Sequence, residues 1–291
     1  MNTFLRSIGF GDLKQQKDVE ELIVKVISGA GDIEKYQRKD NTGYVEYSLQ
    51  TSSSCGIKVI GEEDLEGKFH FGHYFPFMKA TSDSSEEEIY ITKKVDTDGL
   101  TGMCDDYRLG ISIIFYIQNV VDCYNCYGEI KTINDQAVRF AALAESGKII
   151  LPTLNYTAEK VKRKKEAGNK SKLIAEAKKG NPEAIESLTI KDIDNYAKVS
   201  MRIKSEDILS IVDTSILPYG SESEMYNITG NILGVSSETN IQTGEKIWVM
   251  QMECNEIEID LCINAADLEG KPEVGRRFRG NVWLQGKIMQ T

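Results

Sequence analysis

The chain has 291 residues and a formal net charge of −10, with a pI near 5.0. Hydrophobic residues make up 41% and charged residues 27%, which is typical of a globular protein. Six cysteines in a chain of this length exclude a disulfide scaffold, and the acidic balance argues against wholesale binding of polyanions. The longest apolar stretch, from Ile111 to Ile117, is too short to span a bilayer, and the first residues lack a signal peptide's apolar core. We therefore expect a cytoplasmic protein without a membrane span.

The first predicted element is a helix. Apolar residues recur at three- and four-residue spacings from Val19 to Ile27, and the glycines at positions 29 and 31 end the pattern. Strand candidates rich in β-branched and aromatic residues follow at 44–50, 56–61, 68–75, 87–95, 108–119, 136–143 and 147–151. We predict that residues 1–152 form an α+β domain with a mainly antiparallel sheet.

Residues 153–220 change in character. Lys, Glu and Ala dominate the first half, which favours solvated helices. Asn181 can cap a helix in which Pro182 occupies the first position. We predict a helical connector over 153–220, and a helical insertion is the alternative.

The C-terminal region alternates clearly between apolar and polar residues. A two-residue turn at Asn255 and Glu256 would pair two strands so that apolar residues always meet. The expected pairs are Cys254 with Ile257, Met252 with Ile259, Met250 with Leu261 and Trp248 with Ile263. A register slip of one residue would bury acidic side chains instead, so the pattern specifies this pairing.

The last strand candidate, from Phe278 to Ile288, also alternates. Phe278, Val282, Leu284 and Ile288 lie on one side, and Arg277, Arg279 and Trp283 lie on the other. Glycines inside these strands are typical of the sharp bends at barrel corners. We predict that residues 221–291 form a small OB-like β-barrel, with an SH3-like barrel as the alternative.

Four segments together resemble a known family. They are FLRSIGF (4–10), GMCDDYRLGISIIFYIQN (102–119), EDILSIVDTSILPYGSESEMY (206–226) and VGRRFRGNVWLQGKI (274–288). They are similar to an uncharacterised family of bacterial proteins, a domain-of-unknown-function family of anaerobic Gram-positive bacteria. The resemblance implies a bacterial cytosolic protein and transfers no catalytic residue.

Two groups of basic residues suggest a nucleic-acid surface. Residues 159–179 hold nine Lys and Arg against three Glu, among them Lys160, Lys162, Arg163, Lys164 and Lys165. Arg277, Arg279 and Trp283 share a strand face on which the tryptophan could stack a base. The alternatives are a solvated helix, a solvated strand face, and a tryptophan that packs against the neighbouring domain.

A zinc site is a further hypothesis. His70 and His73 have the spacing H-x-x-H, and Cys123 and Cys126 have the spacing C-x-x-C, so they could supply four tetrahedral ligands. Independent packing roles are the alternative, since 120–130 is typical of a strand followed by a turn.

The usual signatures of catalysis do not occur in the sequence. It contains neither G-x-S-x-G nor a glycine-rich phosphate loop. We therefore favour a non-enzymatic interaction or binding protein, with another protein as its partner and no cofactor. RNA or single-stranded nucleic-acid binding and a zinc-containing protein are the alternatives.

Overall fold

The chain divides into two compact units in a computed structural model. The structure describes residues 2–13, 15–40, 42–94, 99–106, 108–109, 111–128, 132–134, 136–152, 173, 176–177, 179–190, 213–220 and 224–289. One unit is Met1–Ile150 with Thr214–Thr291, and the other is Leu151–Asp213. The predicted 1–152 domain and 221–291 barrel are therefore parts of one unit, and the segment between them is an insertion.

The first unit begins with a short 3-10 helix and an α-helix. The 3-10 helix η1 (Thr3–Ile8) is capped by Asn2, whose side chain accepts a hydrogen bond from the Phe4 backbone N–H. Helix α1 (Gln16–Ser28) buries Val19, Leu22 and Val26 and ends at Gly29, as its spacing predicts.

A four-stranded antiparallel sheet follows in the described residues. Its order is β1 (Asp32–Gln37), β2 (Gly43–Gln50), β3 (Cys55–Glu63) and β4 (Phe69–Met78). The sequence pattern predicts the last three strands and misses β1, because every second residue of β1 is exposed and most of its side chains are polar.

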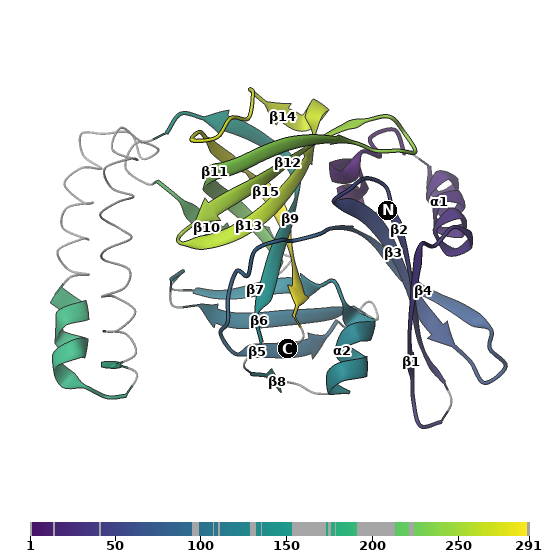
Figure 1. Cartoon of the computed structure of the whole chain (residues 1–291), viewed down its shortest axis with the longest axis horizontal. Coiled ribbons are helices and arrows are strands. Elements are labelled where there is room, and N and C mark those ends of the chain that lie inside the picture. Colours follow the sequence, from purple (N-terminus) through teal and green to yellow (C-terminus); the bar gives the residue numbers. More distant parts are fainter. Residues whose placement is uncertain are drawn as a thin grey trace. The chain divides into compact units, whose positions relative to one another are not determined.

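The remaining strands belong to one long sheet (Figure 1). Its described order is β10 (Ser215–Pro218), β11 (Met225–Thr239), β12 (Lys246–Cys254), β13 (Ile257–Asn264), β9 (Val138–Ile150), β15 (Arg277–Ile288), β7 (Ile111–Ile117), β6 (Leu100–Asp106), β5 (Ile89–Lys93) and β8 (Thr132–Ile133). The short helix η2 (Ala265–Asp267) leads into β14 (Leu268–Glu269), which pairs with β9.

An additional pairing of β11 with β15 closes part of this sheet into a barrel. Within the described residues, the barrel strands are β11, β12, β13, β9 and β15, which is the strand number of an OB-like barrel. The C-terminal segment provides every one of them except β9, which lies before the insertion. The predicted barrel is confirmed, and β9 adds to it a strand that the prediction placed in the 1–152 domain.

The β12–β13 hairpin has the predicted register. The four pairs from Cys254–Ile257 to Trp248–Ile263 are all present. Asn255 and Glu256 both have positive φ, 51° and 66°, as a tight hairpin turn requires. Two glycines lie opposite each other where β9 pairs with β15. A Cβ at Gly280 would lie 2.3 Å from the Ser146 carbonyl oxygen, and one at Gly147 would lie 2.2 Å from the Phe278 ring, so neither position has room for a side chain.

Helix α2 (Val120–Tyr127) corrects the expected strand and turn at residues 120–130. The β-branched pair Val120 and Val121 suggests a strand, but both side chains are fully buried on one side of a short helix. No helix among the described residues is long and apolar enough to cross a membrane.

Candidate ligand-binding pocket

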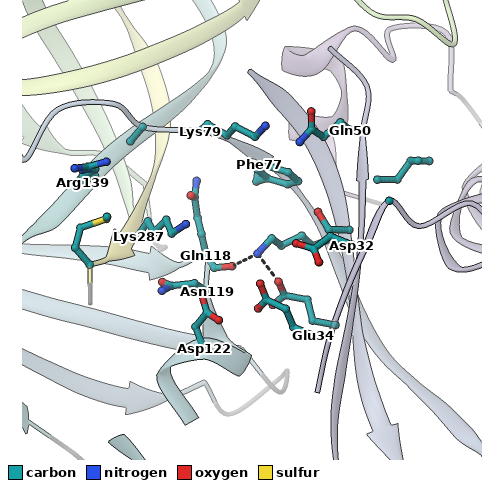
Figure 2. A pocket seen from close by; sticks show the side chains of 17 residues that line it. Asp32, Glu34, Gln50, Phe77, Lys79, Gln118, Asn119, Asp122, Arg139 and Lys287 are labelled. Carbon is teal, nitrogen blue, oxygen red and sulfur yellow. Dashed lines mark hydrogen bonds and ion pairs between the residues drawn. The ribbon is translucent and has the colours of Figure 1, made fainter. Parts of the chain in front are cut away.

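A cavity of about 490 Å³ lies in the first unit, between the four-stranded sheet and the β7–α2 junction. Strands β1 to β4 supply one wall. The opposite side comes from residues at the start of α2, the beginning of β9 and the end of β15. Figure 2 shows Asp32 and Glu34 on one side, Arg139 and Lys287 on the other, and Gln118 with Asn119 between them.

A buried ion pair forms the floor of the pocket. Glu46 on β2 is only 1% exposed, and its Oε1 pairs with Nζ of Lys58 on β3, which is 13% exposed. Lys58 also donates to the Gln118 carbonyl oxygen at 3.0 Å. The second oxygen of Glu46, Oε2, is buried without a hydrogen-bond partner. Burial raises the pKa of the Glu46 carboxyl, and the Lys58 ammonium opposes that rise.

Glu34 on β1 and Asp122 on α2 form a pair of carboxyl groups beside this ion pair. Burial raises the pKa of the Glu34 carboxyl to about 7, with further contributions from the charges of Glu46 and Asp122 and from a hydrogen bond to Asp122. Two carboxyl groups can share a hydrogen bond only when one holds a proton. Oε2 of Glu34 is also buried without a partner. The pocket therefore contains two buried carboxylate oxygens whose acceptor capacity is unused.

Buried amides fix the backbone around the pocket. Gln118 donates to the Met78 carbonyl oxygen at 2.9 Å and to Oε1 of Gln285 at 2.6 Å. Asn119 donates to the Ile288 carbonyl oxygen and accepts from the Ile288 N–H, at 2.9 and 3.1 Å. These bonds join the end of β7 to β4 and β15, so this side of the pocket is built on rigid elements.

Arg139 and Lys287 line the side opposite Glu34, and Lys79, which directly follows β4, borders the pocket beside Phe77 (Figure 2). Arg139 pairs with Asp83, with Nε 2.6 Å from Oδ1. Lys79 and Lys287 are exposed, and neither Nζ forms a hydrogen bond or an ion pair with the described residues. The pocket therefore borders two buried carboxylate oxygens without partners and two exposed lysines, of which Lys79 also lowers the pKa of the Glu238 carboxyl by its charge.

The structure buries most of the β15 face on which the sequence predicts a nucleic-acid surface. Arg277 is 4% exposed and Trp283 is 7% exposed, and Arg279 is half-buried. The Trp283 ring lies 5.4 Å from the Phe4 ring and 5.1 Å from the Tyr116 ring, measured between centroids. The face interpreted as solvent-exposed is covered because η1 and β7 pack on it, and Trp283 packs within the molecule as the alternative proposed. The interior face, with Phe278, Val282, Leu284 and Ile288, is confirmed.

The basic residues Lys160, Lys162, Arg163, Lys164 and Lys165 lie outside the described residues. Their predicted role therefore stays a prediction from the sequence. Arg279 borders a second hollow of about 380 Å³ on the barrel, together with the acidic residues Asp267 and Glu269.

The structure does not assemble the four predicted zinc ligands. His70 bonds to Asp64 at 2.7 Å, and His73 bonds to the Tyr116 hydroxyl at 2.7 Å. Cys123 is buried on α2, whereas Cys126 on the same helix is exposed. Across the part of the chain that the structure describes, no three His, Cys, Asp or Glu side chains gather as metal ligands.

The pocket residues carry a weak signal that sequence analysis missed. Glu46 and Lys58 are single charged residues within the apolar strand segments YVEY and GIKVIG. In the observed register Glu46 is opposite Ile60 and Lys58 is opposite Ser48, which makes the two charges diagonal neighbours on one face. If the register of β2 with β3 had been known, the ion pair between Glu46 and Lys58 could have been predicted.

Fold and pocket together define an α+β protein in which a closed barrel and a second antiparallel sheet flank a charged cavity. The chain belongs to the family described as "Domain of unknown function, E. rectale Gene description (DUF3881)", whose model matches residues 5–286. No curated protein and no solved structure matches the chain. The resemblance seen in the sequence to an uncharacterised bacterial family is thus confirmed.

Proposed function

We propose that the chain is a non-enzymatic binding protein and that the pocket above Lys58 and Glu46 binds a small polar ligand. The observation that carries this proposal is the buried Oε2 of Glu46, which has no hydrogen-bond partner and belongs to a residue that lines the cavity. An unsatisfied buried acceptor costs about 1–3 kcal/mol, which a ligand donor would recover. A cavity of about 490 Å³ is also within the usual size range of small-molecule sites.

The pocket is preorganised in a way that suits binding. The Lys58–Glu46 pair and the amides of Gln118 and Asn119 fix its floor through bonds to β2, β7 and β15. Ligand binding would therefore cost little conformational entropy at these side chains.

The test is a thermal-shift screen of the full chain with small ions, zwitterions and sugars. At least one compound should raise the melting temperature of the wild type. The variant Gly31→Trp should abolish that rise, since Gly31 lines the pocket and a Cβ there meets no atom within 4 Å. Ile241→Trp, at a residue that is 76% exposed and does not line the pocket, is the control. A ligand whose effect survives Gly31→Trp would place binding elsewhere and contradict the proposal.

Binding of RNA or single-stranded nucleic acid remains an alternative proposal with a narrower basis. The burial of Trp283 and Arg277 leaves the charge of residues 159–179 as its support. Binding through that charge alone should fall steeply with salt and show no base preference. Replacing Lys162, Arg163, Lys164 and Lys165 by Glu should abolish it, and absence of binding at low salt would end this alternative. A protein partner, zinc binding and a cytoplasmic location stay predictions.

A further inference from the structure

We propose that the ligand of the pocket is a small zwitterion of the amino-acid or short-peptide class. Its ammonium group would contact Glu34 and Glu46, and its carboxylate would contact Lys79 and Lys287. This inference depends on the proposed function, and it specifies the chemistry of the ligand.

The acidic side favours a ligand group that is a positively charged hydrogen-bond donor. Glu34 and Glu46 each present a buried oxygen without a partner, and Lys58 compensates only one of the two charges. An ammonium group carries three donors, so it can satisfy both oxygens at once. Divalent cations need several oxygen ligands around one point, and the described residues provide no such group of three. An organic ammonium therefore fits this side better than a metal ion.

The lysines at the rim of the pocket favour an anionic ligand group. Lys79 and Lys287 border the cavity without an ion pair to any described residue, whereas Arg139 is already paired with Asp83. In Figure 2 Lys287 lies with Arg139 across the pocket from Asp32 and Glu34, and Lys79 lies at the rim beside Phe77 and Gln50. A ligand carboxylate that contacts either ammonium group would gain charge-assisted hydrogen bonds.

Both charges in one ligand explain the pocket better than either charge alone. A simple anion would lie near Glu34 and Glu46, and a simple cation or polyamine would lie near Lys79 and Lys287, so each would meet repulsion from the opposite side. A zwitterion matches both sides, and like-charge repulsion excludes the ligands with one charge.

The protonation of Glu34 supplies an independent signature. The groups that face Glu34 are Glu46 on β2, Lys58 on β3 and Asp122 on α2. Because its carboxyl titrates near pH 7 in the free protein, an incoming ammonium must displace the shared proton. Binding near pH 7 should therefore release a proton, and affinity should rise as the pH increases from about 6 to about 8.

Isothermal titration calorimetry of the full chain tests the inference with a series of probe compounds that differ in charge and length. The zwitterions are glycine, 4-aminobutyrate, 6-aminohexanoate and dialanine, and the probes with one charge are hexylamine and hexanoate. At least one zwitterion should bind about tenfold or more tightly than both probes with one charge, because two charged contacts form together. Titration in buffers of different ionisation enthalpy should detect the released proton.

Charge-neutralising variants assign the two ends of the ligand. Glu34→Gln should weaken the zwitterion about tenfold and remove proton release, and the double variant Lys79→Gln with Lys287→Gln should weaken it by a similar factor through the carboxylate. Glu20→Gln on the exposed face of α1 is the control and should change neither. If no zwitterion binds, or if hexylamine or hexanoate binds equally well, the inference is wrong. The proposed function would survive that result if another compound in the screen loses its effect in Gly31→Trp.

Discussion

Trp283 is the residue through which β15 packs against η1 and β7. Its ring packs between Phe4 of η1 and Tyr116 of β7, and only 7% of it is exposed. Trp283→Ala should therefore lower the free energy of unfolding by about 3–5 kcal/mol, because it leaves a cavity at this junction. Urea denaturation provides the measurement. Trp248→Ala is the matched control: that ring is half-buried and lies 4.0 Å from the Lys246 ammonium, so the loss should be only about 1–2 kcal/mol. Equal losses would show that Trp283 is not a packing centre.

Glu34 should make stability depend on pH in a direction opposite to that of a paired carboxylate. Its pKa in the folded chain is about 7, above the ordinary value of 4.5 for a glutamate side chain, so the folded state binds more protons between these pH values. The contribution of Glu34 to the free energy of unfolding therefore falls as pH rises from about 4.5 to about 7. Because Glu34 is half-buried, solvent screening reduces the effect to about 1–2 kcal/mol. Glu34→Gln should be more stable than the wild type by that amount at pH 8 and equal to it at pH 4. A difference that does not vary with pH would contradict this assignment, and Glu20→Gln should give such a constant difference.

Single residues show why the candidate site was beyond sequence analysis. Glu34 lies in a strand that alternation does not reveal, and Asp122 lies in a segment interpreted as a strand and turn. Lys79 and Lys287 are separated by more than 200 positions and meet at one pocket only through the fold. Basic clusters are visible in a sequence, whereas pairs of opposite charge across a cavity are not.

The β12–β13 hairpin is the element that the sequence specifies most completely. Its turn still contains a conformational cost, because Glu256 adopts a φ of 66°, which a side chain with a Cβ disfavours. Glu256→Gly should raise the free energy of unfolding by about 0.5–1 kcal/mol, since Asn-Gly suits this turn better. Thermal denaturation can measure the change. Glu66→Gly, in an exposed turn without positive φ, should be neutral or slightly destabilising. A destabilised Glu256→Gly variant would mean that the Glu256 side chain supports the turn.

Other elements were less predictable for physical reasons that differ. The register of β12 with β13 follows from neighbouring alternation, because a slip would exchange the apolar face of β13 for the face that carries Glu258 and Asp260. In the observed register Asp260 is also buried, where it accepts hydrogen bonds from Thr81. Helix α2 is short and begins with two valines, so local propensity favours the wrong structure and tertiary burial decides. The faces of β15 were assigned correctly as inside and outside, but the outside face is covered by η1, whose position no local pattern encodes.

At the scale of the whole molecule, the barrel is closed by a strand that comes from before the insertion. Strand β9 runs parallel to β13 and antiparallel to β15. The sequence pattern predicts two separate strands, at 136–143 and 147–151, where the structure has the single strand β9, and it places both in the 1–152 domain, because pairing between distant segments leaves no local trace. The class of fold and the existence of the barrel were thus predictable, and its closure was not.

The division into two units predicts that the barrel folds without residues 153–212. Ile150 pairs with Arg277 on β15, which neighbours β11, and Ser215 pairs with Thr229 on β11. Three strand spacings, or about 14 Å, therefore separate the two ends, a span that about eight Gly and Ser residues can bridge. The shortened chain should unfold cooperatively, with a free energy of unfolding within about 2 kcal/mol of the full chain, because loop length affects stability only weakly. It should keep its pocket ligand and lose any binding of nucleic acid that depends on residues 159–179. A shortened chain that is unfolded, although it is joined by a linker of sufficient length, would show that the insertion supports the barrel.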